Sequence, residues 1–195
     1  DPTPSPQSID QARNIPFLEG QSSPIEASRI YCKSARMTPD NHGGGTAEKP
    51  FGEMLNNLEP GEVVVFQELI DRGPSAWHAT DLAIEMVKKG QGFYMIGNHE
   101  SMMLAGMCGD GRALFHWLQN HGLVLLQTLP GYGEKLKGMD YIQALPIISE
   151  DIRNRDPNLK KLFELKDFLL RYGKVYQFIN NIMATHAGIL CDAKG

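Results

Sequence analysis

EVVVFQELIDRGPSAW (residues 62–77) and GFYMIGNHE (residues 92–100) are the two stretches that decide the fold. Each carries a short apolar run, as buried parallel strands do, and then turns polar. Between them, from Pro74 to about Lys89, apolar side chains recur at a helical period, which predicts a helix. Strand, helix and strand make a βαβ unit, so the sequence predicts an α/β fold. The polar residues follow the carboxyl ends of two parallel strands, the edge where active sites of open α/β sheets form.

Weaker patterns predict the elements on either side of this unit. Residues 157–171 carry the clearest helical stripe of apolar side chains. Asn180 and Asn181 separate two short apolar runs and predict a hairpin over residues 175–185. The run at 123–129 is too short to decide between helix and strand. Further expected elements are a short strand at 30–32 and helices at 47–58, 102–107 and 113–119.

Length and composition predict one globular domain. The chain has 195 residues, of which 42% are hydrophobic and 22% charged, as is ordinary for a globular protein with a substantial core. Residues 1–24 are rich in proline among small polar residues, and this composition predicts a flexible N-terminal arm. We therefore expect residues 25–195 to form the folded domain.

Charge, cysteines and hydropathy narrow the classes of partner and compartment. The formal net charge of −4 argues against nucleic acid as the main partner. The three cysteines lie far apart and predict neither a disulfide framework nor a thiolate zinc site. No apolar run approaches the ~20 residues that a membrane helix needs, and no signal peptide is visible. We therefore expect a cytoplasmic protein without a membrane partner.

Asp40 and His42 lie in a glycine-rich loop that follows Pro39. In extended backbone, residues two positions apart project to the same side, so a carboxylate and an imidazole can meet one ion there. This pair of ligands suits manganese, iron or zinc. The competing interpretation is an ordinary loop turn in which Asp40 bonds to its own backbone.

Polar residues also follow the two strands of the βαβ unit. Glu68 and Asp71 come after the first strand, where a carboxylate can bridge two metal ions, and Arg72 offers a planar fork of donors that suits phosphate oxygens. A surface ion pair near a turn is the alternative. Asn98 and His99 end the second strand.

The residues at the second strand suggest acid–base chemistry as well as metal binding. The Asn98 side-chain oxygen is a neutral hard ligand, and His99 can donate a proton to a leaving group if Asp71 orients its ring. Glu100 can instead hold the local loop through backbone donors. His186, at the end of the predicted hairpin, offers a further imidazole ligand.

The order and spacing of these fragments resemble the calcineurin-like metallophosphoesterases. More narrowly, they are similar to the phosphoprotein phosphatase (serine/threonine phosphatase) family in its bacterial and phage-like branch, which includes symmetrical diadenosine tetraphosphate hydrolases. The segment from Leu114 to Gly133, with Trp117 and Tyr132, also resembles that branch loosely. The motifs that carry the resemblance are Asp-x-His at 40–42, Asp-Arg-Gly-Pro at 71–74, Gly-Asn-His-Glu at 97–100 and His-Ala-Gly at 186–188.

The resemblance implies a central β-sandwich flanked by helices, with two divalent metal ions of manganese, iron or zinc. It implies a phosphatase in which these two ions activate a bridging water that attacks phosphorus. Asp40 and His42 would hold the first ion, Asn98 and His186 the second, and Glu68 would bridge both.

The resemblance also implies the remaining roles and the substrate class. His99 would be the general acid, oriented by Asp71, and Arg72 would bind the substrate phosphate. The substrate would be a phosphoprotein or a phosphorylated small molecule, with protein dephosphorylation as the first expectation.

Three departures from the family pattern bear on activity. The family has Gly-Asp where this chain has Gln67-Glu68, and the longer Glu carboxylate reaches about 1.5 Å further from the backbone. No strand is expected before the Asp-x-His motif, where Met37-Thr38-Pro39 stand. A further His ligand, expected downstream of His186, is not identifiable, so we expect a domain that is truncated at its C-terminus.

These departures leave two alternatives to an active protein phosphatase. One is a catalytically impaired pseudo-phosphatase that acts as a binding module. The other is a diadenosine tetraphosphate hydrolase, which would use the same metal centre.

Overall fold

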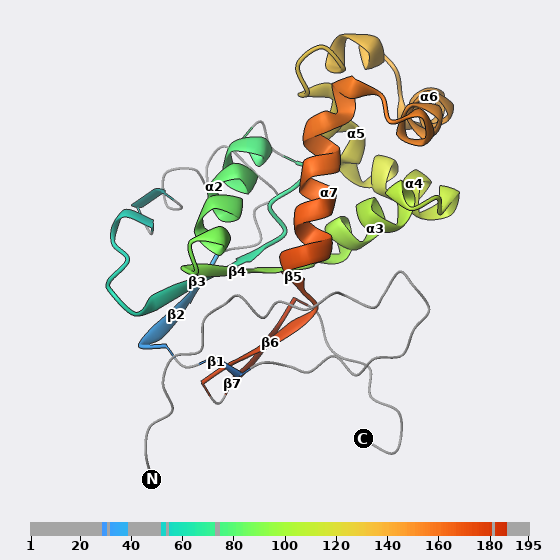
Figure 1. Ribbon diagram of the computed structural model, residues 1–195. Helices are drawn as coiled ribbons and strands as arrows, with labels where there is room; N and C mark the ends of the chain where they lie inside the picture. The colour runs from blue at the N-terminus through green and yellow to red at the C-terminus, as the bar shows by residue number, and fades with distance from the viewer. Residues whose placement is uncertain are drawn as a thin grey trace, which may run out of the picture.

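The computed structural model describes residues 29–30, 32–38, 52–53, 55–72, 75–180 and 182–186. These residues form an α/β fold in which helices cover a parallel sheet and a second, smaller sheet lies on the other side (Figure 1). The expected N-terminal arm, the predicted metal ligands Asp40 and His42, and the glycine-rich loop around them all fall outside the described residues.

The larger sheet contains the predicted βαβ unit. Its strands are all parallel and follow the order β2-β3-β4-β5. β3 and β4 pair in the middle of the sheet, and α2 connects them, as the sequence predicts. The bounds are Ser34–Met37 for β2, Glu62–Gln67 for β3, Ala76–Lys88 for α2, Gly92–Met95 for β4 and Gly173–Lys174 for β5.

β2 corrects one expectation, because a strand does precede the Asp-x-His motif. Polar Ser34 and Arg36 alternate with Ala35 and Met37, so no apolar run marks this strand in the sequence. It is held instead by backbone pairing with β3. In addition, the Ser34 hydroxyl and the Arg36 guanidinium donate to the two carboxylate oxygens of Glu62, at 2.5 and 2.7 Å.

The second sheet has the order β1-β6-β7, with bounds Arg29–Ile30, Tyr176–Ile179 and Ile182–Thr185. β6 and β7 pair antiparallel and form the predicted hairpin. β1 pairs parallel with β6. It begins one residue before the strand expected at 30–32, and Cys32 is not part of β1.

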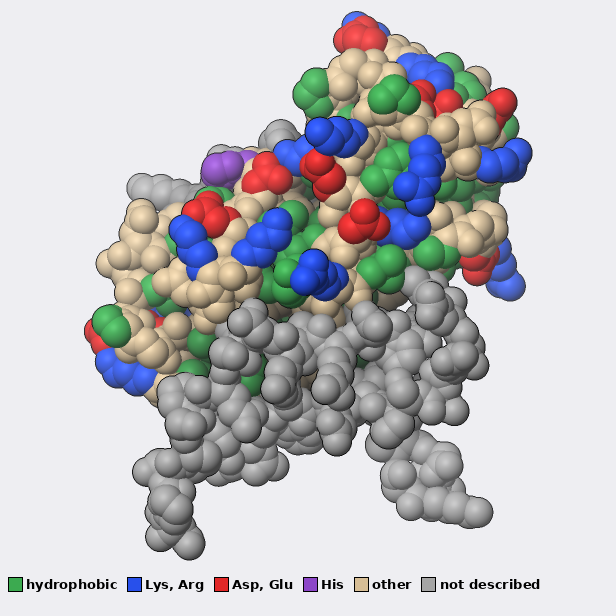
Figure 2. Space-filling model, in the orientation of Figure 1, with side chains coloured by type: hydrophobic (Ala, Val, Ile, Leu, Met, Phe, Trp, Pro, Cys, Tyr) green, Lys and Arg blue, Asp and Glu red, His purple; other side chains and the backbone are tan. Residues whose placement is uncertain are grey.

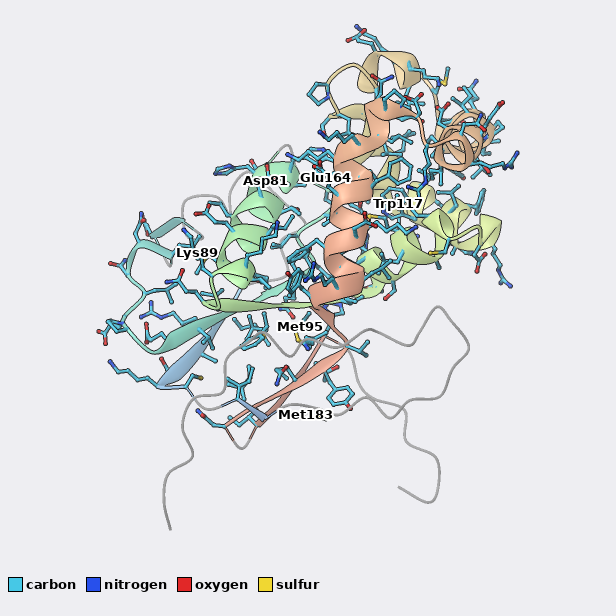
Figure 3. The ribbon with its side chains drawn as sticks, in the orientation of Figure 1. Asp81, Lys89, Met95, Trp117, Glu164 and Met183 are labelled. Carbon is cyan, nitrogen blue, oxygen red and sulfur yellow. The ribbon has the colours of Figure 1, made fainter. Side chains whose placement is uncertain are left out.

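Alternate residues of β3 and β4 face two different layers, because successive side chains in a strand point to opposite faces. One set packs toward the second sheet and includes Met95, which lies between the two sheets (Figure 3). The other set packs toward the helices in the main core. The first set is Val63, Val65, Phe93 and Met95, packed with Ile179, and the second is Val64, Phe66 and Tyr94.

The helices after β4 form most of the main core. The predicted helices at 102–107 and 113–119 are present as α3 and α4, and α3 begins directly at Asn98. The ambiguous run at 123–129 is a short helix, and the predicted helix at 157–171 is a 3-10 turn at Pro157–Leu159 followed by α7. Of the helix expected over 47–58, residues 52–53 and 55–56 are helical in the described part. The bounds are Asn98–Met107 for α3, Gly111–Trp117 for α4, Leu123–Gln127 for α5 and Lys160–Tyr172 for α7.

α6, Tyr141–Asn154, has no counterpart among the sequence expectations. Pro146 lies inside it, and an internal proline argues against a helix in a sequence. The signal that marks the helix is its start, where Asp140 accepts hydrogen bonds from two backbone N–H groups and Gln143 bonds back to the Asp140 N–H. β5 was likewise not expected, because two residues are too few to form a pattern.

The surface of the described part mixes charges of both signs. Figure 2 shows Lys and Arg side chains interspersed with Asp and Glu on the face in view. One such pair, Lys161 on α7 with Asp81 on α2 at 2.7 Å, links two helices of the main layer. None of the helices in the described ranges is long and apolar enough to cross a membrane.

Candidate active site

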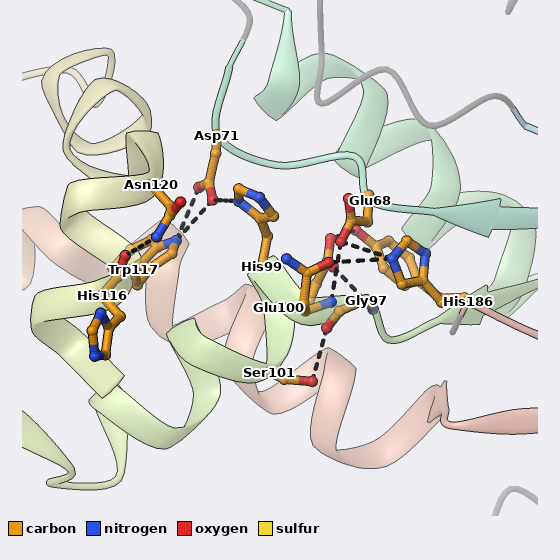
Figure 4. Close-up of polar contacts among 12 residues, drawn as sticks. Glu68, Asp71, Gly97, His99, Glu100, Ser101, His116, Trp117, Asn120 and His186 are labelled. Carbon is orange, nitrogen blue, oxygen red and sulfur yellow. Dashed lines mark hydrogen bonds and ion pairs between the residues drawn. The ribbon is translucent and has the colours of Figure 1, made fainter. Parts of the chain in front are cut away.

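Most of the predicted site residues that the structure describes meet beyond the carboxyl ends of β3, β4 and β7 (Figure 4). Glu68 and Asp71 follow β3, and Asn98 and His99 form the first turn of α3 just after β4. His186 follows β7, on the second sheet. The parallel arrangement of β3 and β4 therefore places the two central motifs side by side, as the sequence predicts.

Glu68, Asn98 and His186 form one cluster of donor atoms. Oε1 of Glu68 lies 3.0 Å from Nε2 of His186 and accepts the backbone N–H of Asn98 at 3.1 Å. The same His186 nitrogen lies 3.2 Å from Oδ1 of Asn98. Three residues predicted as metal ligands are thus brought together although His186 lies 88 residues beyond Asn98.

The longer side chain of Glu68 is accommodated by the backbone around it. Glu68 has a φ of +41°, an uncommon conformation for a residue with a side chain. Its carboxylate lies directly over Gly97, where an added Cβ would be 2.3 Å from Cγ and 2.5 Å from Oε1 of Glu68. A glycine at position 97 is therefore required for this placement of the Glu68 carboxylate.

Gln67, the other departure from the family motif, connects β3 to the end of β2. Its side-chain amide donates to the carbonyl of Thr38 at 3.0 Å, and its backbone N–H donates to the Thr38 hydroxyl at 3.1 Å. Thr38 is fully buried and precedes Pro39 in the sequence. The Gln67 side chain thus supplies a hydrogen bond to the Thr38 carbonyl, because the Gln67 backbone N–H is bonded to the Thr38 hydroxyl instead.

The donor set of the cluster fits a divalent metal ion. A carboxylate, an imidazole nitrogen and an amide oxygen together suit manganese, iron or zinc. Among the described residues, no group of three or more His, Cys, Asp and Glu could hold a metal, so the Asn98 amide is needed to complete this set. The other imidazole nitrogen, Nδ1 of His186, is buried and has no hydrogen-bond partner within the described ranges.

His99 and Asp71 make the contact that the sequence predicts. Nδ1 of His99 lies 2.5 Å from Oδ2 of Asp71, and both side chains are almost fully buried. The hydrogen bond to Asp71 raises the pKa of His99, which favours the protonated ring. Asp71 has a φ of +92°, so the backbone is held in an unusual conformation where this carboxylate is placed.

Trp117 is the site residue that sequence reasoning did not identify. Its indole N–H lies 3.0 and 3.1 Å from the two carboxylate oxygens of Asp71, on the opposite side from His99 (Figure 4). Trp117 is fully buried, and a buried indole N–H needs an acceptor. The signal in the sequence that could have indicated this contact is a tryptophan on an apolar helix face, whose indole N–H needs a hydrogen-bond acceptor.

Glu100 holds the loop before α3, as expected. Its Oε2 accepts the backbone N–H of Gly97 at 3.1 Å, and its Oε1 accepts the Tyr94 hydroxyl at 2.9 Å. Burial raises the pKa of Glu100 to about 7. Burial, followed by the neighbouring Glu100 charge, also raises the pKa of Tyr94 well above its usual value.

The other chemically interesting residues lie away from the cluster or outside the described part. Arg72 is exposed immediately after Asp71. Of the histidines to which the sequence assigned no ligand role, His78 and His121 are exposed and His116 is half-buried on α4. Cys32 and Cys108 are free thiols.

Comparison with protein-family models, with curated proteins and with solved structures finds no match for this chain.

Proposed function

We propose that this protein is a metal-dependent phosphoesterase that hydrolyses phosphomonoesters, with phosphoproteins as its substrate class. The proposal combines the resemblance of the motifs to the calcineurin-like metallophosphoesterases with the arrangement of the residues. In this proposal the two packed sheets and their helices are the sandwich of that family.

One observation supports the proposal most. Glu68, Asn98 and His186 converge from three separate strand ends, and the Asp71–His99 pair lies beside them. A cluster of metal-type donors next to a buried His–carboxylate pair is what phosphate ester hydrolysis needs, because one group must hold the reaction centre and another must protonate the leaving oxygen. An ordinary surface ion pair would not bring a carboxylate and an amide oxygen to the same imidazole nitrogen.

In the proposed mechanism the chain's own residues orient the ester and move one proton. His99 presents its Nε2 to the leaving oxygen, because its Nδ1 is engaged by Asp71. Arg72, exposed at the edge of the site, binds the phosphate oxygens through its planar guanidinium. Breakdown of the ester then leaves an alcohol protonated by His99 and a free phosphate.

The cofactor is two divalent ions, of manganese, iron or zinc. Asp40 and His42 would hold the first of them, Asn98 and His186 the second, and Glu68 would serve both. When bound, such ions supply Lewis-acid activation of the attacking water and neutralise phosphate charge.

The test is hydrolysis of 4-nitrophenyl phosphate and of a phosphopeptide by the full chain loaded with Mn²⁺, with metal content measured by elemental analysis. We expect turnover of both substrates, and we expect His99→Gln to lower kcat on the phosphopeptide by about 10²-fold or more, the range for loss of a general acid. His78→Gln is the matched control, because His78 is exposed and is not one of the cluster residues, and the activity of this variant should equal that of the wild type.

The outcomes separate the proposal from its alternatives. A chain that binds Mn²⁺ but hydrolyses neither aryl, peptide nor dinucleotide phosphates would refute the enzyme and favour a binding module. Hydrolysis of diadenosine tetraphosphate, with none of the phosphopeptide, would replace the substrate class and keep the metal centre.

A further inference from the structure

Trp117 shares one carboxylate with His99. The Asp71 carboxylate is fully buried, and its Oδ2 lies 2.5 Å from Nδ1 of His99 and 3.1 Å from the indole nitrogen of Trp117. Its Oδ1 lies 3.0 Å from the same indole nitrogen. The indole N–H therefore bridges both oxygens and restricts rotation of the carboxylate about its Cβ–Cγ bond.

The hydrogen bond from Trp117 matters for the Asp71 carboxylate because this carboxylate is fully buried. A buried carboxylate is stable only when donors satisfy it, and donors on two sides also fix its orientation. Asp71 is held at a φ of +92°, a conformation that persists only where the surroundings determine it. Trp117 comes from α4, an element separate from the loop that carries Asp71, so it ties that loop to the helical layer.

The position of the indole is itself fixed by the packing around it. After Trp117 the chain continues through a kinked turn at Leu118–Gly122, in which Asn120 and His121 leave helical geometry and His121 takes a φ of +74°. This turn passes so close to the indole that a Cβ on Gly122 would lie 2.5 Å from Cε2 of Trp117. The indole ring therefore cannot shift toward Gly122 without displacing the backbone there.

From these contacts we infer that Trp117 is a positioning residue, which fixes the Asp71 carboxylate and through it the ring of the general acid His99. This inference rests on the proposed function and deepens it. In the hydrolysis, the oxygen of water bonds to phosphorus and the electron pair of the breaking P–O bond stays on the leaving oxygen. That oxygen takes the proton of His99, the attacking water loses one proton to solvent, and His99 regains a proton from solvent before the next turnover.

The inference predicts an effect that depends on the leaving group. An alkyl leaving oxygen needs the proton in the transition state, whereas 4-nitrophenolate leaves well without it. In Trp117→Phe an aromatic ring remains but the indole N–H is lost, and misplacement of a catalytic group by ~1 Å lowers rates by about 10²-fold. We therefore expect kcat on an alkyl phosphate to fall by about that factor, kcat on 4-nitrophenyl phosphate to fall far less, and KM to change little for either.

Trp77 provides the matched control. It is the other tryptophan of the chain, it is also buried, and its indole N–H donates to the Leu125 carbonyl and the Thr128 hydroxyl, away from the site. Trp77→Phe removes a comparable buried hydrogen bond, so both esters should respond to it equally. Comparison of the two variants therefore distinguishes a general loss of packing from a loss of orientation of the Asp71 carboxylate and the His99 ring.

A spectroscopic readout tests the same contact without activity. In ¹⁵N-labelled full chain the Nδ1 proton of His99, identified by its absence in His99→Gln, should give a low-field signal in the wild type and in Trp77→Phe. That signal should shift or vanish in Trp117→Phe. An unchanged signal in Trp117→Phe would overturn the inference.

The kinetic outcomes distinguish the two levels of the argument. If the wild type hydrolyses neither ester, the proposed function fails and the catalytic meaning of Trp117 fails with it. If the wild type is active but Trp117→Phe slows both esters equally, or neither, the positioning role is overturned and the proposed function stands.

Discussion

At the scale of single residues, the site depends on a glycine as much as on its charged groups. The sequence marks Glu68 as a departure that places a carboxylate too far from the backbone. The structure resolves this in two ways, because Glu68 adopts a positive φ and Gly97 leaves room for its side chain. The departure and the glycine are therefore parts of one arrangement.

Gly97→Ala should disturb Glu68 and little else. The added Cβ would lie 2.3 Å from Cγ of Glu68, so the side chain must move, and overpacking of this kind costs about 1–3 kcal/mol. Urea unfolding would measure that loss of stability. The control is Gly111→Ala, where no heavy atom lies within 4 Å of the added Cβ and stability should not fall. Equal stability of the two variants would show that Glu68 does not occupy this position.

At the scale of elements, β2 is fixed to β3 at both ends by side chains. At one end Glu62 accepts hydrogen bonds from the Glu59 N–H, the Ser34 hydroxyl and the Arg36 guanidinium. At the other end Gln67 bonds to the carbonyl of Thr38. These contacts explain how a strand with only four residues and an alternating polar sequence holds its place at the edge of the sheet.

Glu62 predicts a pH dependence of stability. The hydrogen bond from the Glu59 backbone, and then those from Ser34 and Arg36, lower its pKa to about 2. Since the folded pKa lies below the unfolded value of about 4.3, the stabilisation is complete above pH 5 and is lost as pH falls toward 2. The difference in unfolding free energy between wild type and Glu62→Gln, measured in urea at several pH values, should therefore shrink as pH falls. A difference that stays constant with pH would contradict this.

Elements with a strong periodic pattern were predictable, and elements defined by side-chain contacts were not. The βαβ unit, the hairpin and α7 follow from apolar runs and turn residues that lie close together in the sequence. β2 depends on partners from β3, and α6 contains Pro146, which contradicts its local pattern. Similarly, the contact of Asp71 with His99 could be predicted from the two motifs that follow β3 and β4, whereas that of Asp71 with Trp117 depends on how α4 packs.

At the scale of the whole molecule, an ion in the cluster would join both sheets. Glu68 and Asn98 follow two strands of the larger sheet, and His186 follows a strand of the second sheet, so an ion they share binds only the folded chain. Ligands of this kind stabilise the folded state as a whole. Metal binding at this site should therefore depend on the folding of the whole molecule.

Mn²⁺ should accordingly raise the free energy of unfolding. At a free concentration 100 times its Kd the gain is about 2.7 kcal/mol, and a chelator should reverse it. Urea unfolding with and without Mn²⁺ measures the gain, and His186→Gln should lose it. A wild type whose unfolding midpoint ignores Mn²⁺ would contradict an ion held by these residues.

The separation of 88 residues between Asn98 and His186 also has a consequence for how the chain folds. Contacts between residues so far apart close late, because the entropy of a long loop must be overcome first, and they lower folding rates. During synthesis the βαβ unit and the following helices emerge well before the last hairpin. We therefore expect the cluster of Glu68, Asn98 and His186 to assemble after the βαβ unit has folded, when His186 docks against Glu68 and Asn98.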